Sequence, residues 1–420
     1  MKKRFGSAFL AAVLAAVSFS GCGSAVKSEN LVESIKPDPV PVYNRIDEGQ
    51  SAAVAQFSAQ LLNKLSDGDK NVVYSPLSVL YALAMTANGA EGETLAQMEE
   101  VFGMPLDQLN GYLHSTVNLL PSDEGYDFDI ANSIWIKNDE DKFTANEDFL
   151  TTVKSYYDAG VFTAEFDQQT LKDINNWVTQ KTNGQIQNVL DRIDENAVMY
   201  LINALNFEAD WLNDYNEYDV NDGTFTKADG TMQDAEFMYK RENGYLSDED
   251  TRGFIKYYKD KKYAYVALLP EAGVNIDDYI ASLDGEKLTN LLNTADMAQE
   301  VETAIPKYET TYDTEMSEIF KALGMTDAFD SRLADFSKMG TAQVEGENIC
   351  INRIIHKAFI RVAEKGTQAG AATVVEMIAE GAMMIENPPK EVYLNRPFVY
   401  MIIDPQTKLP LFMGAVYEIE

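Results

Sequence analysis

The side chains that most often perform chemistry in proteins are sparse in this chain of 420 residues. It contains two histidines, His114 and His356, and two cysteines, Cys22 and Cys350. These are too few for a metal centre built from His and Cys clusters. No nucleophile elbow, zinc-protease helix or phosphate-binding loop motif is present. Carboxylate pairs stay open as candidates, because 67 acidic residues are scattered along the chain. We therefore expect no metal, no cofactor and no enzymatic activity.

The net charge of −33 narrows the class of partner. A surface this acidic repels nucleic acid and anionic lipid, so we expect no nucleic-acid partner. It attracts basic macromolecules instead.

The N-terminus has the pattern of an export signal. Lys2, Lys3 and Arg4 precede an apolar run that is shorter than a membrane span and that ends in "FSGC". These letters resemble a bacterial lipoprotein box. We expect residues 1–21 to be a signal peptide and Cys22 to carry lipid. The protein would then be attached to a membrane outside the cytoplasm, in the cell envelope or at the cell surface. The alternative is an ordinary secretory signal and an extracellular protein.

Lipid on Cys22 would leave Cys350 without a disulfide partner, so we expect Cys350 to be a small buried apolar residue. Residues 22–50 hold three prolines and show no sustained period. This pattern predicts a tether.

The residues after the tether alternate helical and strand patterns. Val54, Phe57, Leu61 and Leu65 recur at helical spacing, and "SPLSVLYALAMTANGA" offers Ser75 as an N-cap. "ETLAQMEEVFG" indicates a further helix, whereas "IANSIWIK", "AYVALLPEAG", "VYLNRPFVYMIID" and "PLFMGAVYEI" indicate strands. No repeat or linker divides residues 51–420, so we expect one mixed α+β domain.

The stretch "EKGTQAGAATVVEM", Glu364 to Met377, carries only small side chains between Gly366 and Thr373. At the odd positions from Thr367 to Ala379 no residue is charged, while every charge of the run lies at an even position. This alternation suits a strand with one face to bury. An Ala-rich helix is the alternative, but two glycines and three β-branched residues disfavour it.

Several segments spread along the chain together resemble the serpin family of protease inhibitors. They are "NVVYSPLSVLYALAMTANGAEGETLAQMEEVFG", "INNWVTQKTNGQIQNVL", "MYLINALNFEADW", "IPKYETTYDTEMSEIFKALGMTDAF", "IIHKAFIRVAEKGTQAGAAT", "VYLNRPFVYMI" and "LFMGAVYEIE". The resemblance implies the serpin fold, with mixed helices, three β-sheets and an exposed reactive-centre loop. It implies a suicide inhibitor of serine, and also cysteine, endopeptidases. Such an inhibitor traps the acyl-enzyme by inserting its cleaved loop as a new strand of sheet A.

The resemblance also assigns roles to residues. The loop hinge would be Glu364, Lys365, Gly366, Thr367, Gln368, Ala369, Gly370, Ala371, Ala372 and Thr373. Ser75, Ser78, Asn203 and His356 match the family's shutter, a polar cluster beneath the strands that separate. Trp211 matches the tryptophan where insertion starts, and Lys307 with Glu364 matches an ion pair at the base of the loop. Otherwise His356 would be a satisfied core histidine and Trp211 simply core.

The scissile bond is harder to place. The family's usual spacing points to Glu380–Gly381, but 30 residues separate Gly366 from Pro397, more than in most members. The candidates are Glu380, Gly381, Ala382, Met383, Met384 and Ile385. The methionines suit an elastase- or chymotrypsin-like protease and Glu380 a glutamyl endopeptidase; we favour the methionines.

We expect a monomer. The alternative function is a serpin-fold protein that binds a ligand or acts as a chaperone without inhibiting anything.

Overall fold

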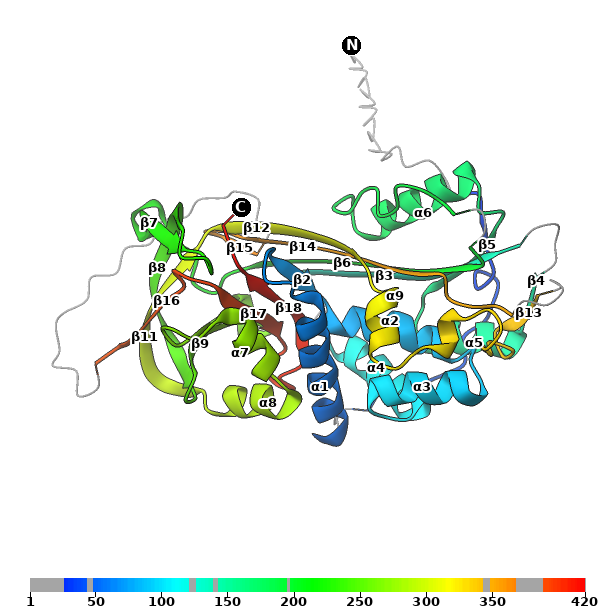
Figure 1. Ribbon diagram of the computed structural model, residues 1–420, viewed down its shortest axis with the longest axis horizontal. Coiled ribbons are helices and arrows are strands. Elements are labelled where there is room, and N and C mark those ends of the chain that lie inside the picture. Colours follow the sequence, from blue (N-terminus) through cyan, green and yellow to red (C-terminus); the bar gives the residue numbers. More distant parts are fainter. Residues whose placement is uncertain are drawn as a thin grey trace, which may run out of the picture.

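The computed structural model describes residues 26–43, 48–120, 126–138, 143–194, 197–342, 348–367 and 388–419. Three β-sheets and a set of helices form the body of the protein (Figure 1). The helices are α1 (Glu48–Leu65), α2 (Pro76–Ala87), α3 (Gly92–Phe102), α4 (Leu106–Leu119), α5 (Glu147–Tyr156), α6 (Gln168–Lys181), α7 (Ile276–Ser282), α8 (Gly285–Asn293) and α9 (Ser317–Ala322). This arrangement confirms the predicted α+β class with three sheets.

Within the described residues, sheet A has seven strands in the order β1-β5-β3-β6-β15-β14-β12. Their bounds are β1 (Glu29–Asn30), β5 (Gly160–Ala164), β3 (Tyr126–Lys137), β6 (Met199–Asp210), β15 (Gly366–Thr367), β14 (Arg353–Val362) and β12 (Tyr308–Glu315). Strand β3 runs antiparallel to β6, whereas β6 and β14 run parallel. The middle of the sheet is therefore a parallel seam between β6 and β14.

Sheet B follows the path β16-β11-β8-β9-β10-β17-β18-β2, with β7 paired to β8. Its strands are β16 (Lys390–Tyr393), β11 (Asp296–Pro306), β8 (Met232–Ser247), β9 (Thr251–Tyr257), β10 (Ala264–Pro270), β17 (Phe398–Ile403), β18 (Pro410–Val416), β2 (Val72–Tyr74) and β7 (Val220–Thr226). The third sheet pairs β13 (Gly340–Ala342) with β4 (Phe143–Ala145).

Two helix ends lie where the local sequence predicts them. In α2 the Ser75 side chain accepts the Ser78 amide at 3.1 Å, and Pro76 opens the helix. Helix α3 ends at Gly103, whose φ of 70° is the left-handed conformation that glycine adopts without strain. His114 lies on α4, where its Nδ1 is 3.2 Å from the carbonyl oxygen of Tyr156.

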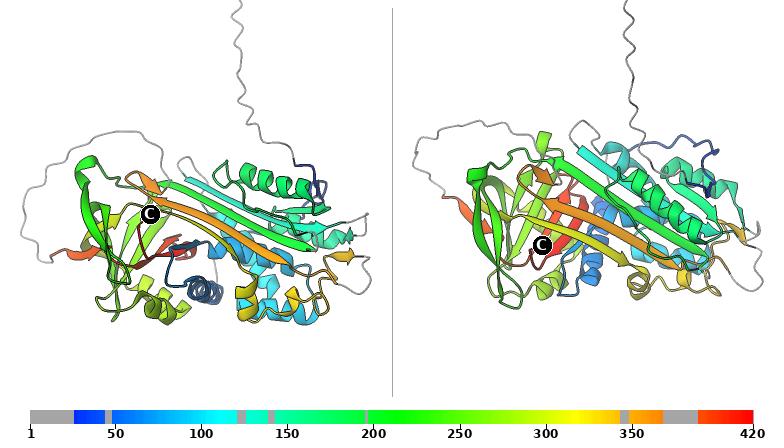
Figure 2. Two further views of the ribbon diagram at one scale, coloured as in Figure 1. Left: turned by 45° about the horizontal axis from the view of Figure 1, so that its top comes forward. Right: turned by 90° about the horizontal axis from the view of Figure 1, so that it is seen from above.

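Sheet A has a hydrophobic core on each face. On one face, α6 packs through Trp177 and Val178 onto Trp135 and Phe162 of the sheet. The other face covers sheet B and the remaining helices, as the oblique views make clear (Figure 2). Cys350 is buried there, as predicted. Helix α6 would therefore have to shift if sheet A gained a strand.

Residues 26–43, which we call the N-terminal strap, do not form the tether expected from the sequence. Strand β1 pairs antiparallel with β5, and Val32 is buried in the core. Farther along, the Asp38 amide donates to the Ser155 hydroxyl at 2.8 Å. Helix α1 also begins at Glu48, inside the range assigned to the tether. The strap shows no hydrophobic period because main-chain hydrogen bonds to the body, not a repeated side-chain face, hold it.

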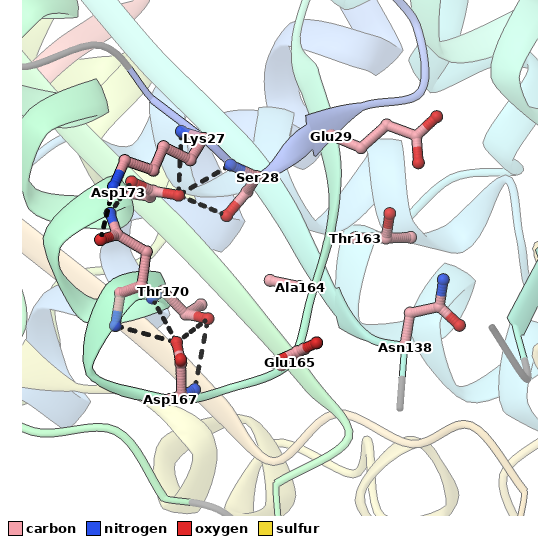
Figure 3. Close-up of a pocket in the computed structure, with 11 residues that line it drawn as sticks. Lys27, Ser28, Glu29, Asn138, Thr163, Ala164, Glu165, Asp167, Thr170 and Asp173 are labelled. Atoms are coloured by element: carbon pink, nitrogen blue, oxygen red, sulfur yellow. Dashed lines mark hydrogen bonds between the residues drawn. The ribbon is translucent and has the colours of Figure 1, made fainter. Parts of the chain in front are cut away.

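The anchor of the strap is the carboxylate of Asp173 on α6 (Figure 3). Its Oδ2 accepts the amides of Lys27 and Ser28 at 3.0 and 2.7 Å, and also the Ser28 hydroxyl at 2.7 Å. Asp173 is only 1% exposed, although it belongs to a surface helix. Beside it a polar hollow of about 300 Å³ opens between the strap, β5 and α6. A buried carboxylate needs such donors, so Asp173 and the strap amides satisfy each other.

Candidate functional site

The predicted hinge residues Gly366 and Thr367 already form a strand of sheet A. They make up β15, in which Thr367 pairs with Ala209 of β6 on one side and with Val362 of β14 on the other. Below this point β6 and β14 pair directly with each other, from Arg353 opposite Tyr200 to Ala358 opposite Leu205. The seam of sheet A is therefore closed along most of its length and holds two hinge residues at its open end.

Gly366 and Thr367 fit this position for different reasons. A β-carbon on Gly366 would lie 2.0 Å from the carbonyl oxygen of Ala209, so only glycine allows the hinge backbone to come this close. The side chain of Thr367 is fully buried, on the face expected from the alternation of the sequence. Its Oγ1 lies 2.6 Å from the hydroxyl of Tyr258.

A short loop after β6 forms hydrogen bonds with the residues that lead into the hinge. The Trp211 amide donates to the Lys365 carbonyl oxygen at 2.7 Å, and the Tyr215 amide donates to that of Glu364 at 2.9 Å. The Trp211 indole Nε1 donates to the carbonyl oxygen of Ala363 at 2.9 Å. Trp211 thus lies at the open end of the seam, in contact with the residues that lead into the hinge.

Ion pairs lie beside these hydrogen bonds. Lys307 lies 2.8 Å from Glu364, as expected, and 3.0 Å from Glu236, which the sequence analysis did not identify. Partial burial raises the pKa of Glu364, but the hydrogen bond from Lys307, a backbone hydrogen bond and the positive charges of Lys307 and Arg361 together outweigh that effect and hold the pKa below its usual value. On the opposite side Lys365 pairs with Asp214 at 2.6 Å. Half-exposed pairs of this kind add little to the stability of the fold.

The predicted shutter residues meet at the centre of the seam. Asn203 of β6 donates its amide to the Ser78 carbonyl oxygen at 2.8 Å, and its amide oxygen bonds His356 Nδ1 across the seam. Asn203 and His356 are also partners in the β6–β14 register. Asn132 of β3 belongs to the same cluster but was not predicted from the sequence; its amide oxygen accepts a hydrogen bond from Asn203. Its polar side chain close to the apolar run "IWI" was the available signal.

His356 is buried and electrically neutral. Desolvation lowers its pKa from 6.5 to about 3. An amide oxygen only accepts, so the bond to Asn203 places the proton on Nδ1. The other nitrogen, Nε2, has no partner within the residues that the structure describes.

A buried ion pair beneath Trp211 was also missed. Lys256 of β9 pairs with Glu242 of β8, with side-chain exposures of 1% and 9%. The ammonium group lies 5.1 Å from the ring of Trp211 and 4.5 Å from that of Tyr215. Desolvation lowers the pKa of Lys256, and the charge of Glu242 opposes that effect. No sequence pattern marks this pair, because both residues alternate like ordinary strand residues.

The remaining sequence predictions fall outside the described residues. These are Cys22, the hinge residues Gln368–Thr373, and the scissile-bond candidates Glu380–Ile385. Over the ranges given above, no group of His, Cys, Asp and Glu side chains is arranged to hold a metal ion. None of the described helices is long and apolar enough to cross a membrane.

Sheet A thus combines a two-residue strand at the open end of its seam with a polar cluster at the centre of that seam. The family model described as "Serpin (serine protease inhibitor)" matches residues 52–419. The chain therefore belongs to the serpin family, whose members generally inhibit proteases rather than catalyse reactions.

Known proteins resemble the chain over most of its length. An uncharacterized serpin-like protein of Thermococcus kodakarensis is 28% identical over 390 residues, covering 90% of this chain and 88% of the relative. The crystal structure of the thermophilic serpin tengpin in its native state is 42% identical, with a TM-score of 0.88 over 94% of this chain and all of that one. The latent state of tengpin is also similar, at 41% identity and a TM-score of 0.78 over 90% of this chain and all of that one.

Proposed function

We propose that this serpin inhibits a serine endopeptidase by drawing its cleaved loop into sheet A between β6 and β14, trapping the acyl-enzyme. Cysteine endopeptidases are a further target class. The observation that carries the proposal is β15, because Gly366 and Thr367 already separate β6 from β14. Insertion would extend a strand that exists, in the direction that the small residues up to Thr373 allow.

The register of β15 supports a link between the hinge and the shutter. If the same antiparallel pairing continued beyond Thr367, each further loop residue would pair one residue earlier along both β6 and β14. Thr373 would then lie opposite Asn203 and His356. These two residues bond each other across the closed seam, and insertion must separate them. Thr373 has the parity of Thr367, so its hydroxyl would enter the buried polar cluster and replace the lost partner.

The energetics favour insertion. An inserted strand breaks one ladder, between β6 and β14, and forms two, so the net gain is about one ladder of backbone hydrogen bonds. At about 1 kcal/mol for each bond, a strand of some ten residues releases on the order of 10 kcal/mol. That is comparable to the whole stability of a typical protease domain.

The test is incubation with elastase-, chymotrypsin-, trypsin- and glutamyl-specific serine proteases, followed by denaturing gels. We expect a complex that survives heat and detergent with at least one of them, and we favour an elastase- or chymotrypsin-like target. Sequencing the released C-terminal peptide should place the cut within residues 380–385. Reversible inhibition, or simple cleavage by every enzyme, would contradict the proposal and favour a non-inhibitory binding or chaperone role.

We also propose that Cys22 anchors the protein by lipid to a membrane outside the cytoplasm, after removal of residues 1–21. The support is the sequence alone: the basic start, the short apolar run and "FSGC". The inhibitor would then act as a monomer in the cell envelope or at the cell surface.

A further inference from the structure

The hydroxyl groups of Tyr258 and Thr367 form a hydrogen bond between the two large sheets. Their oxygens are 2.6 Å apart, and both residues are 0% exposed. Tyr258 follows β9 of sheet B, whereas Thr367 is the last described residue of the hinge in sheet A. Tyr258 therefore belongs to the core beside sheet B, whereas Thr367 belongs to the hinge from which the proposed insertion would proceed.

The aromatic ring of Tyr258 is held rigidly. It stacks on Trp211 with ring centroids 4.4 Å apart and an interplanar angle of 14°, and it meets Phe207 edge-on at 5.3 Å. Its backbone bridges Trp211, and its amide donates to the Tyr263 carbonyl oxygen at 3.0 Å. The hydroxyl consequently has one fixed position, directly beneath the first inserted side chain.

Removing one partner is costly because the other would remain buried. A buried hydroxyl without a partner costs about 1–3 kcal/mol, whereas replacing both partners by apolar groups of similar shape is close to neutral. If Thr367 left the sheet, the hydroxyl of Tyr258 would remain buried without a partner, at this cost of about 1–3 kcal/mol. The bond thus opposes retreat of the hinge from the open end of the seam.

We propose that Tyr258 is a positioning residue for loop insertion, whose hydroxyl latches Thr367 inside sheet A before any cleavage. This inference rests on the proposed inhibitory function and deepens it. The latch fixes the register opposite Ala209 and Val362 from which the strand grows. Pre-organisation of this kind lowers the entropy that must be lost during a later step.

The consequence concerns a competition between two rates. Once the protease has cut the loop and formed the acyl-enzyme, insertion competes with hydrolysis of that ester by water. A hinge that is already paired and in register inserts without first finding its place. Loss of the latch should therefore divert molecules from trapping to turnover, leaving the first encounter with the protease unaffected.

The experiment compares Tyr258→Phe, Thr367→Val and the double variant with the wild type. Amide hydrogen exchange of the peptide around residues 362–367 should become about tenfold faster in each single variant, because one buried hydroxyl is orphaned. The number of inhibitor molecules consumed per protease trapped should rise several-fold, with the association rate unchanged. The double variant should recover toward the wild type in both measurements.

Tyr157→Phe is the matched control. The hydroxyl of Tyr157 is also buried and hydrogen-bonded, to Asn110 in the helical layer, away from the hinge. It should lower stability without changing hinge exchange or the trapping ratio. Equal effects of Tyr157→Phe and Tyr258→Phe would overturn the latch.

Other outcomes separate the two proposals. Unchanged hinge exchange in both single variants refutes the latch, whatever happens to inhibition. Faster exchange with an unchanged trapping ratio refutes the positioning role. If the wild type traps no protease of the panel, the inhibitory function fails, while exchange still reports on the bond in the free protein.

Discussion

At the scale of single residues, His356 connects the chemistry of one side chain to the closure of sheet A. It is buried at the seam, and its Nδ1 bonds Asn203 across β6 and β14, the two strands that the proposed insertion would separate. A protonated imidazole at this site would put an unpaired charge inside the core, which is costly. Protonation of this histidine would therefore destabilise the closed shutter.

We expect acid to weaken the native fold through His356. Its pKa falls from 6.5 to about 3 on folding, so the unfolded chain binds the additional proton between these values. This contribution to stability is complete above about pH 6.5 and declines as the pH falls toward 3. His356→Gln should remove a slope of about 1.4 kcal/mol per pH unit between about pH 4 and 6. Urea unfolding across this range measures it, and parallel pH profiles for variant and wild type would contradict the assignment.

The shutter residues came from the resemblance to serpins, whereas strand alternation and helix caps are local signals that the sequence carries by itself. The buried face of Thr367 and the cap at Ser75 are examples. The Lys256–Glu242 pair could not be foreseen, since it depends on which neighbouring strands meet beneath Trp211. The strap was misjudged for a related reason: its order depends on one carboxylate of α6, 145 residues away from Ser28.

At the scale of elements, the strap joins parts of the molecule that would otherwise be coupled only by packing. It contacts β5 and α6 at one end and α5 and α4 farther along, through Ser155 and Ser115. Strand β5 would be the edge of sheet A without β1. The strap thus covers part of an edge that could pair with another chain.

Asp173→Ala should release the first part of the strap. The amides of Lys27 and Ser28 would lose their common acceptor, at a cost of about 1–3 kcal/mol. Hydrogen exchange of residues 27–31 should increase, and the thermal midpoint should fall. Asp191→Ala, at an exposed position after α6, is the control and should leave both unchanged. Unaltered exchange in Asp173→Ala would mean that β1 pairing alone holds the strap.

At the scale of the whole molecule, the hinge and the strap occupy opposite ends of sheet A. Thr367 pairs with Ala209 near the end of β6, whereas β5 meets β3 beside Trp135, whose β6 partner is Tyr200. Nine residues of strand at about 3.3 Å each separate the two points by about 30 Å. Figure 1 shows β15 and β5 at these two ends.

Cys22→Ala should move the protein from the membrane fraction to the soluble fraction and abolish labelling by radioactive fatty acid. Trapping of a protease by the purified variant should be unchanged, because the residue lies far in sequence from the hinge. Absence of fatty acid on the wild type would refute the lipid anchor and leave ordinary secretion.

Because the strap is bound to the body of the protein, a lipid anchor on Cys22 would hold that body close to the membrane. Only Gly23, Ser24 and Ala25 separate Cys22 from the strap, and four extended steps span about 14 Å. With lipid on Cys22, the strap end of sheet A would face the bilayer and the hinge would point into the surrounding medium, within reach of soluble proteases. Full insertion would carry the captured enzyme toward the lipid, into a gap narrower than a protein. The complex would then have to tilt, or the strap would have to detach from β5 and α6. Detachment would lengthen the link to the membrane by up to 18 residues.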